Sequence, residues 1–272
     1  MTQAGVLTPR SAPGEPRHPR VTPVEFHENG QVARIALEQS VLVPTPVGDV
    51  PAELVTFHPS GAVKRVFPAN GKLSETWSEE DERTLVPVLR IATAVGEIEA
   101  RFISICFFPD GNLRSLTLWP DQRVTLETPL GPLQIRQGLA FRPDGSLESV
   151  EPARPTLVST ALGPLHAFDP QPIGLNADAN SLAFSASGEV IGLATDRDAV
   201  IVVLPDGSRR RYEPTTVLRN CTEACVTGSI LRLRFEHDRV ALRLGAHREC
   251  YPRHAVSVAT PEDGRRHLPC VD

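Results

Sequence analysis

Two short turn signatures alternate along the chain, and this alternation constrains the fold more than any other feature. The first is an aromatic residue followed four positions later by Gly, at residues 26–30, 57–61, 67–71, 107–111, 141–145 and 184–188, with Val in the aromatic position at 203–207. The second is Thr followed three positions later by Gly, at 45–48, 93–96, 128–131 and 160–163. An internal repeat of this kind indicates that one strand–turn–strand unit recurs.

The spacing between the two signatures is regular. From Gly48 to Gly61, Gly96 to Gly111, Gly131 to Gly145 and Gly163 to Gly188 the steps are 13, 15, 14 and 25 residues, and an insertion at 168–180 lengthens the last step. Pro-Ser-Gly and Pro-Asp-Gly within the first signature are typical of tight turns, because Pro presets the first corner and Gly tolerates the left-handed exit. Apolar residues recur in the flanking segments in a pattern close to strand alternation, broken once in a way that a bulge accommodates.

The sequence therefore predicts an all-β protein, an antiparallel meander or solenoid of repeated hairpins. We expect the repeated Phe residues to stack on one another as an apolar ladder. A β-propeller-like fold is an alternative, because residues 182–203 are similar to a strand pair of a propeller blade, and a β-sandwich is another. One short helix is expected at residues 78–86, where Ser78 is a suitable N-cap and acidic residues fill the first turn.

Composition divides the 272 residues into three parts. Residues 1–20 are rich in Pro, Arg and small polar residues, so we expect a disordered N-terminal arm. Residues 21–215 hold the repeated hairpins, and residues 216–272 form a C-terminal hairpin segment.

The sequence also bears on location and partners. The N-terminal arm lacks the apolar stretch of a secretory signal, and no run of apolar residues is long enough to cross a bilayer. We therefore expect a cytoplasmic protein without a transmembrane segment. The net charge of −5 argues against nucleic acid as a partner.

The first signature also carries a family resemblance. The pentapeptides FHENG, FHPSG, FPANG, FFPDG and FRPDG resemble the MORN-variant repeats of YwqK-like bacterial proteins over residues 22–210. This chain departs from those repeats in its longer, uneven spacing and in its added Thr-x-apolar-Gly turns. The resemblance implies an extended array of β-hairpins and a role in protein interaction, membrane association or an antitoxin-like activity. It implies no catalytic residue.

Four of the five Cys residues and four of the eight His residues lie in the C-terminal segment. Zinc needs four ligands in a tetrahedral arrangement, and Cys221, Cys225, Cys250 and His254 are the candidate set. The Cys-x-x-Cys knuckle that would identify a zinc site is missing, so scattered packing residues are the alternative that we favour. Cys106 lies in the apolar segment FISICFF and is expected in the core.

Residues 228–244 alternate between apolar and charged side chains, which predicts a hairpin with one apolar face and one Arg face. Arg232, Arg234 and Arg243 lie on that charged face and are candidates for contact with an anionic partner. A solvated strand face, with the Arg side chains paired to nearby acids, is the reading that we favour.

Motifs for nucleotide binding, metalloproteases and serine hydrolases are absent from the sequence. The leading hypothesis is a non-enzymatic protein-interaction or scaffold module that presents a sheet face or edge to another protein, and exposed edges would also permit a homodimer. A metal-binding or redox-responsive protein using the C-terminal Cys/His residues is an alternative. An enzyme of unidentified class is a third, with His58, His166 and the acids at 79–82 as the first residues to substitute.

Overall fold

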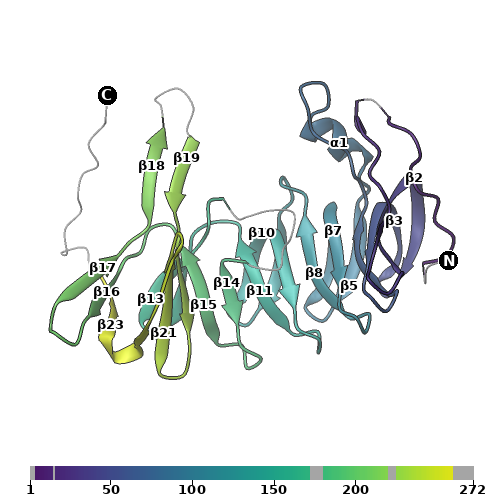
Figure 1. Ribbon diagram of the computed structural model, residues 1–272. Coiled ribbons are helices and arrows are strands. Elements are labelled where there is room, and N and C mark those ends of the chain that lie inside the picture. Colours follow the sequence, from purple (N-terminus) through teal and green to yellow (C-terminus); the bar gives the residue numbers. More distant parts are fainter. Residues whose placement is uncertain (1–3, 15, 172–179, 220–224, 260–272) are drawn as a thin grey trace. The chain divides into compact units, whose positions relative to one another are not determined.

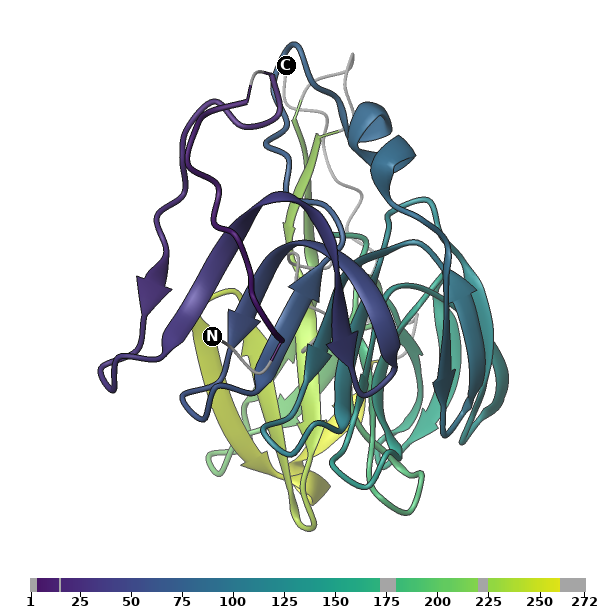
Figure 2. The ribbon, with the colours of Figure 1, turned by 90° about the vertical axis from the view of Figure 1, so that its right-hand side faces the viewer.

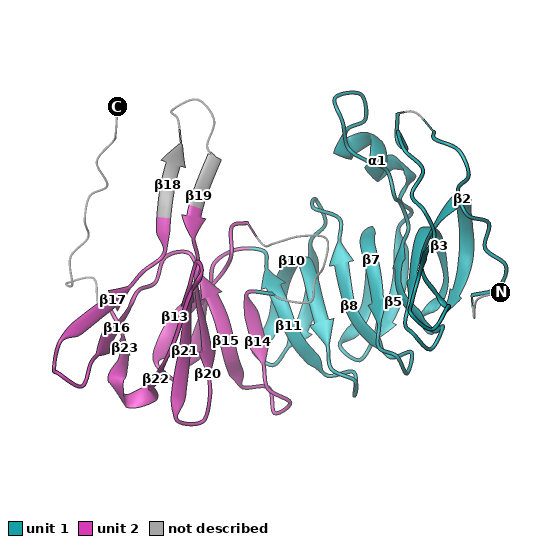
Figure 3. Ribbon diagram, in the orientation of Figure 1, with its two compact units in different colours: residues 1–153, 172–180 teal, residues 154–171, 181–272 magenta. Residues whose placement is uncertain are grey.

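The computed structural model describes residues 4–14, 16–171, 180–219 and 225–259, apart from the side chains of 216–219 and 225–227. Nearly all of its regular structure is β-strand, and the strand pairings within each part of the chain are antiparallel (Figure 1). The predicted all-β fold of repeated hairpins is therefore confirmed. Two compact units divide the chain: residues 1–153 with 172–180 form unit 1, and residues 154–171 with 181–272 form unit 2 (Figure 3). This division differs from the one expected at residue 215.

Unit 1 is a meander whose main sheet has the strand order β1-β2-β3-β4-β7-β8-β10-β11. Two further strand pairings, β5 with β6 and β9 with the first half of β10, are made by hairpins of the second signature. The elements are β1 (Glu25–Phe26), β2 (Val32–Thr45), β3 (Gly48–Phe57), β4 (Val63–Phe67), α1 (Glu79–Leu85), β5 (Leu89–Thr93), β6 (Gly96–Ala100), β7 (Phe102–Phe107), β8 (Leu113–Leu118), β9 (Val124–Thr128), β10 (Gly131–Phe141) and β11 (Leu147–Pro152).

Unit 2 contains a sheet of order β14-β15-β20-β21-β22, a sheet of order β17-β16-β23, and the separate pairs β12–β13 and β18–β19. The elements are β12 (Thr156–Thr160), β13 (Gly163–Ala167), β14 (Leu182–Phe184), β15 (Val190–Thr195), β16 (Val200–Val203), β17 (Arg209–Tyr212), β18 (Thr215–Arg219), β19 (Cys225–Ser229), β20 (Leu231–Phe235), β21 (Arg239–Leu244), β22 (His247–Pro252), the 3-10 helix η1 (Arg253–Ala255) and β23 (Val256–Val258).

The first signature forms one kind of turn at six of its seven occurrences. At 57–61 the amide of His58 donates to the carbonyl of Ala62, the amide of Gly61 donates back to His58, and the pairing register shifts by one residue at Phe57. Gly61 has φ +84°, a left-handed conformation that favours glycine. This is a hairpin closed by a glycine bulge. The same two bonds recur in the turns ending at Gly30, Gly111, Gly145, Gly188 and Gly207.

The segment 67–71 (FPANG) is the exception, and its grouping with the hairpin turns was wrong. Each of the six turns begins with a donation from the amide that follows the aromatic or Val residue. Pro68 stands at that position and has no amide hydrogen, so the hairpin cannot close there. The chain instead leaves β4 and runs through a loop to α1, which begins after the N-cap Ser78 with a capping box to Asp81. The expected helix is confirmed.

The second signature forms two-residue hairpin loops held by the Thr side chain. Thr93 donates its hydroxyl to the carbonyl of Gly96 over 2.7 Å and accepts from the amide of Val95 over 3.3 Å. The same pair of bonds occurs at Thr45, Thr128 and Thr160. Apolar residues stand two positions before the Thr and two positions after the Gly, and they pair across the hairpin. Both residues are buried in the pairs Val43/Val50, Ile91/Ile98 and Val158/Leu165.

The core follows from these two turns. The repeated Phe residues at the ends of β3, β7, β10 and β14 are all at most 1% exposed: Phe57, Phe107, Phe141 and Phe184. Adjacent repeats are joined by side chains that reach the neighbouring turn: His27 and His58 bond through Nε2 to the carbonyls of Phe57 and Phe107. Contacts between neighbouring repeats of this kind are the general rule in repeat folds.

The described part of the N-terminal segment contacts β2 instead of extending freely as an arm. Pro9 forms a bridge with Leu37, and the amide of Arg10 donates to the carbonyl of Ala36 over 2.9 Å. The amide of Lys72 donates to Arg17, which ties the segment to the loop after β4. Figures 1 and 2 show this segment running along β2 toward the end of the unit 1 strands where the loop and α1 lie.

Candidate binding pocket

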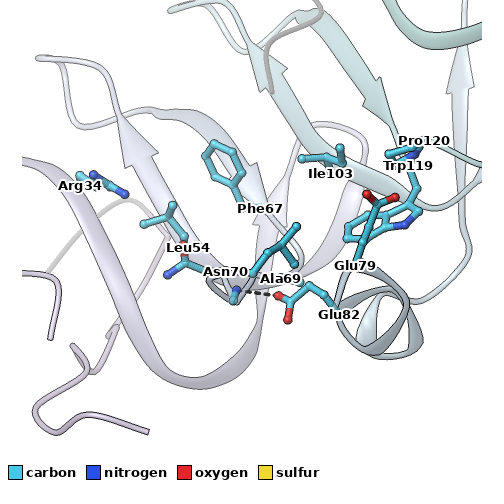
Figure 4. Close-up of a pocket in the computed structure, with 12 residues that line it drawn as sticks. Arg34, Leu54, Phe67, Ala69, Asn70, Glu79, Glu82, Ile103, Trp119 and Pro120 are labelled. Atoms are coloured by element: carbon cyan, nitrogen blue, oxygen red, sulfur yellow. Dashed lines mark hydrogen bonds between the residues drawn. The ribbon is translucent and has the colours of Figure 1, made fainter. Parts of the chain in front are cut away.

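A pocket of about 330 Å³ opens in unit 1 where the loop after β4 and α1 cover the end of the main sheet (Figure 4). This volume lies at the lower end of the range for ligand sites, about 300–1,000 Å³. Most of the lining is apolar, with charged side chains from β2 and α1. The lining residues are Arg34, Leu54, Phe67, Ala69, Asn70, Gly71, Leu73, Glu79, Glu82, Ile103, Trp119 and Pro120.

One wall of the pocket is fixed by the carboxylate of Glu82, a residue only 3% exposed. Arg17 donates to it through Nε (2.8 Å) and Nη2 (2.7 Å), and the indole Nε1 of Trp77 donates over 2.6 Å. The amide of Gly71 donates over 2.6 Å, the bond drawn in Figure 4. A Cβ at Gly71 would overlap this carboxylate, so only glycine lets the loop approach so closely.

Arg17 joins this wall to a second buried carboxylate, on β3. Its Nη1 and Nη2 donate to Glu53 over 3.1 and 2.8 Å, and the amide of Asn70 donates to Glu53 over 3.0 Å. The guanidinium carbon also lies 5.5 Å from the centroid of the Trp77 ring, within the range of a cation–π contact. One cation therefore bridges two carboxylates and one aromatic ring, and the loop amides complete the carboxylate bonding.

The electrostatics keep the Arg17–Glu82 pair ionised. The hydrogen bonds to Glu82 hold the pKa of Arg17 above its ordinary value. Burial by itself would raise the pKa of Glu82, but the bonds from Arg17, Trp77 and Gly71 outweigh burial and leave that pKa below the usual value for glutamate. A carboxylate with a lowered pKa is a poor proton donor or acceptor near neutral pH, so this network is suited to fixing the shape of the pocket.

The opening of the pocket carries two further charges. Arg34 forms an ion pair of 3.3 Å with Glu25. Glu79 is exposed, and within the described residues no hydrogen bond or ion pair reaches its carboxylate. Trp119 is a further lining residue of the same pocket, and Figure 4 labels both side chains. Trp119 is 7% exposed and its Nε1 has no hydrogen-bond partner among the described residues.

The candidate zinc ligands are only partly within the described structure. Cys221 lies outside the described residues, and Cys225 lies on β19 with a side chain that is not described. Cys250 is an exposed free thiol on β22, where Arg239 Nε donates to its sulfur over 3.1 Å, and His254 lies in η1. Among the described residues no three His, Cys, Asp or Glu side chains form a group that could hold a metal ion. Zinc binding by these four residues stays a prediction.

The candidate interaction residues lie on β20 and β21 of unit 2. Arg232 and Arg243 are direct cross-strand partners, and Arg234 is exposed on the same strand as Arg232. Arg232 Nη2 donates to Asp169 over 2.6 Å, and the Asp169 side chain is only 3% exposed. One member of the expected basic face is therefore committed to an internal ion pair, while Arg234 and Arg243 face outward.

The residues suggested for an enzyme, apart from Glu79, have internal partners. His58 is buried against the carbonyl of Phe107, and His166 Nδ1 lies 3.1 Å from a carboxylate oxygen of Asp198 in unit 2. The acids of α1 have separate roles, since Asp81 completes the capping box, Glu80 pairs with Arg83, and Glu79 and Glu82 line the pocket.

Sequence reasoning missed Arg17, Glu53 and Trp77 as site residues. Glu53 gave a usable signal, because it is a single charge within the apolar strand segment PAELV, and a charge in such a position needs a partner. Arg17 gave none, because it lies in a segment whose composition is typical of disorder.

The class of protein that this fold and pocket define is an all-β hairpin-repeat protein in which the short helix α1 lies beside a preformed pocket in unit 1. Comparisons with protein-family models, curated proteins and solved structures found no match to the chain. The resemblance to MORN-variant repeats therefore stays a prediction. Within the described residues, no helix has the length and apolarity needed to cross a membrane.

Proposed function

We propose that this protein is a non-enzymatic, cytoplasmic interaction module, and that the pocket of unit 1 receives a side chain of a partner protein. The observation that carries the proposal is the pocket itself: a mostly apolar cavity whose polar wall is held by the Arg17, Glu53, Glu82 and Trp77 network. A preformed, rigid pocket favours binding, because little conformational freedom is lost when a ligand enters.

Exposed apolar surface at the edge of the pocket favours a partner protein as the ligand, in preference to a small molecule that the pocket would enclose completely. Leu73 lines the pocket and is 51% exposed. A large apolar side chain left in water at the edge of a pocket is typical of a surface that a partner covers. The pocket would then hold an anchoring side chain, as the central pockets of protein interfaces do.

The test compares affinity capture from the native host by the wild-type chain and by a variant with a filled pocket. Ala69→Trp places a large ring in the pocket. Ala92→Trp is the matched control, because Ala92 is exposed on the β5–β6 hairpin and does not line the pocket. Circular dichroism during heating verifies that both variants fold.

We expect one protein to be recovered in near-equal amount with the wild type and with Ala92→Trp, and to be lost with Ala69→Trp. Equal recovery with Ala69→Trp would overturn the assignment to the pocket, and so would the absence of any stoichiometric protein. A homodimer through sheet edges is distinguished in the same experiment, because a differently tagged copy of the chain would then be the captured protein.

A further inference from the structure

Helix α1 contributes two glutamates to the lining of the pocket. Glu79 and Glu82 are three residues apart on the helix, a spacing that places both side chains on one side of it. Glu82 is paired with Trp77, and this pair binds the guanidinium of Arg17 through charged hydrogen bonds and a ring contact. Glu79 and Trp119 both line the pocket, and Figure 4 draws both side chains in its lining.

The Trp77–Glu82 pair shows which kind of chemical group this region can bind. A carboxylate and an indole face together attract a cation, because the carboxylate supplies the charge and the ring supplies its negative face. Arg17 uses this combination within the chain itself. Trp119 and Glu79 offer the same two kinds of group in the lining of the pocket, but no described residue donates to or pairs with the Glu79 carboxylate.

The charge at the opening favours a cation. Arg34 is paired with Glu25, whereas the Glu79 carboxylate is unpaired within the described residues. Leu54, Phe67 and Ile103 supply an apolar floor. Arg and Lys side chains match such a site, because their methylene stems pack on apolar surface while their charged ends reach a carboxylate.

We infer that the pocket receives an Arg or Lys side chain of the partner protein, with its charged end at Glu79 and Trp119 and its stem on the apolar floor. This inference rests on the proposed function and adds the chemistry of the occupant. A partner segment with a basic residue next to apolar ones would place a positive charge at the opening and would cover the exposed Leu73 at the rim with apolar side chains.

The experiment uses nuclear magnetic resonance, because the chain has only two Trp residues and therefore two indole N–H signals. The full-length protein is titrated with the peptide acetyl-Leu-Arg-Leu-amide, with the same peptide carrying neutral citrulline in place of Arg, and with n-butylguanidinium. The Trp119→Phe variant assigns the signals. It removes no hydrogen bond within the described chain, because Nε1 of Trp119 has no partner there.

We expect the Arg peptide to shift the Trp119 signal while the Trp77 signal, held by Glu82, stays in place. The citrulline peptide should bind about tenfold more weakly, the loss expected when one charged contact is removed. Glu79→Gln should abolish the preference for Arg. Glu75→Gln should retain it, because Glu75 is an exposed carboxylate of the same loop that does not line the pocket.

Equal affinity for the Arg and citrulline peptides would overturn the inference, as would an Arg preference that survives Glu79→Gln or a Trp119 signal that does not move. If n-butylguanidinium bound as tightly as the peptide, the natural occupant would be a small organic cation, and the proposal that it is a side chain of a partner protein would be overturned. These outcomes are independent of the capture experiment, because Ala69→Trp blocks the pocket whatever the charge of its occupant.

Discussion

Arg17 and Glu82 are 65 residues apart in the sequence and are joined by two hydrogen bonds of 2.8 and 2.7 Å. The pair ties the N-terminal segment to the only α-helix of the described chain. Glu53 on β3 is bound by the same guanidinium. Because the shape of the pocket wall depends on this single cation, the network provides the most direct predictions about stability.

Replacing Arg17 by Ala leaves two buried carboxylates without their cation. Removal of one partner from a buried ion pair costs roughly 3–5 kcal/mol, and because the Arg17 side chain keeps some exposure we expect about 3 kcal/mol. Denaturant unfolding followed by Trp fluorescence measures this loss, because Trp77 and Trp119 both belong to unit 1. Arg20→Ala, a change at an exposed Arg of the same segment, should have little effect, and equal losses in the two variants would contradict the assigned role.

Acid should weaken unit 1 through Glu82. The pKa of Glu82 in the folded protein lies below the ordinary value of 4.5, so its contribution is complete above that pH and is lost as the pH falls toward the folded pKa. The Glu82→Gln variant should be less stable at neutral pH and should lose less stability than the wild type below pH 4.5. Parallel curves of unfolding free energy against pH for the two proteins would contradict this prediction.

Gly71→Ala should disturb the pocket without changing any charge. The added Cβ would overlap the Glu82 carboxylate and push it away from Arg17 and Trp77. We expect a loss of about 1–3 kcal/mol, the range for overpacking a filled site, together with a changed Trp fluorescence spectrum. Gly14→Ala is the control, because its nearest neighbour is the end of the Arg10 side chain at 3.4 Å. The prediction fails if Gly71→Ala and Gly14→Ala behave alike.

The Thr of the second signature should stabilise its hairpin through its hydroxyl. Thr93→Val keeps the shape but removes the bonds to Gly96 and Val95, so we expect a loss of about 1 kcal/mol. Thr93→Ser keeps the hydroxyl and should retain most of the stability. Trp fluorescence again reports on unit 1, and a Val variant as stable as the Ser variant would show that the side-chain bonds contribute nothing.

Much of the fold could be predicted because the repeat is local. A turn of three to five residues is decided by the φ preference of Gly and by which amides are available, and both can be read directly from residues such as Gly61 and Gly111. The same reasoning, applied more strictly, would have separated 67–71 from the other turns, since Pro68 lacks the amide that closes each of them.

The pocket could not be predicted, because its contacts are not local. Arg17 pairs with Glu53 and Glu82 across 36 and 65 residues, and no short-range pattern indicates which distant carboxylates one Arg will reach. Composition also favoured the wrong prediction, because a Pro- and Arg-rich segment is typical of disorder. The described part of this segment is instead held by hydrogen bonds to β2 and by the side chain of Arg17.

The central claim is that a partner protein binds at the pocket of unit 1. Hydrogen–deuterium exchange on the purified complex, compared with the free chain, tests this claim most directly. We predict slower exchange in residues 69–73 and in α1 when the partner is bound. Slower exchange confined to β20 and β21, the strands that carry Arg232, Arg234 and Arg243, would contradict the account and assign binding to the Arg face of unit 2.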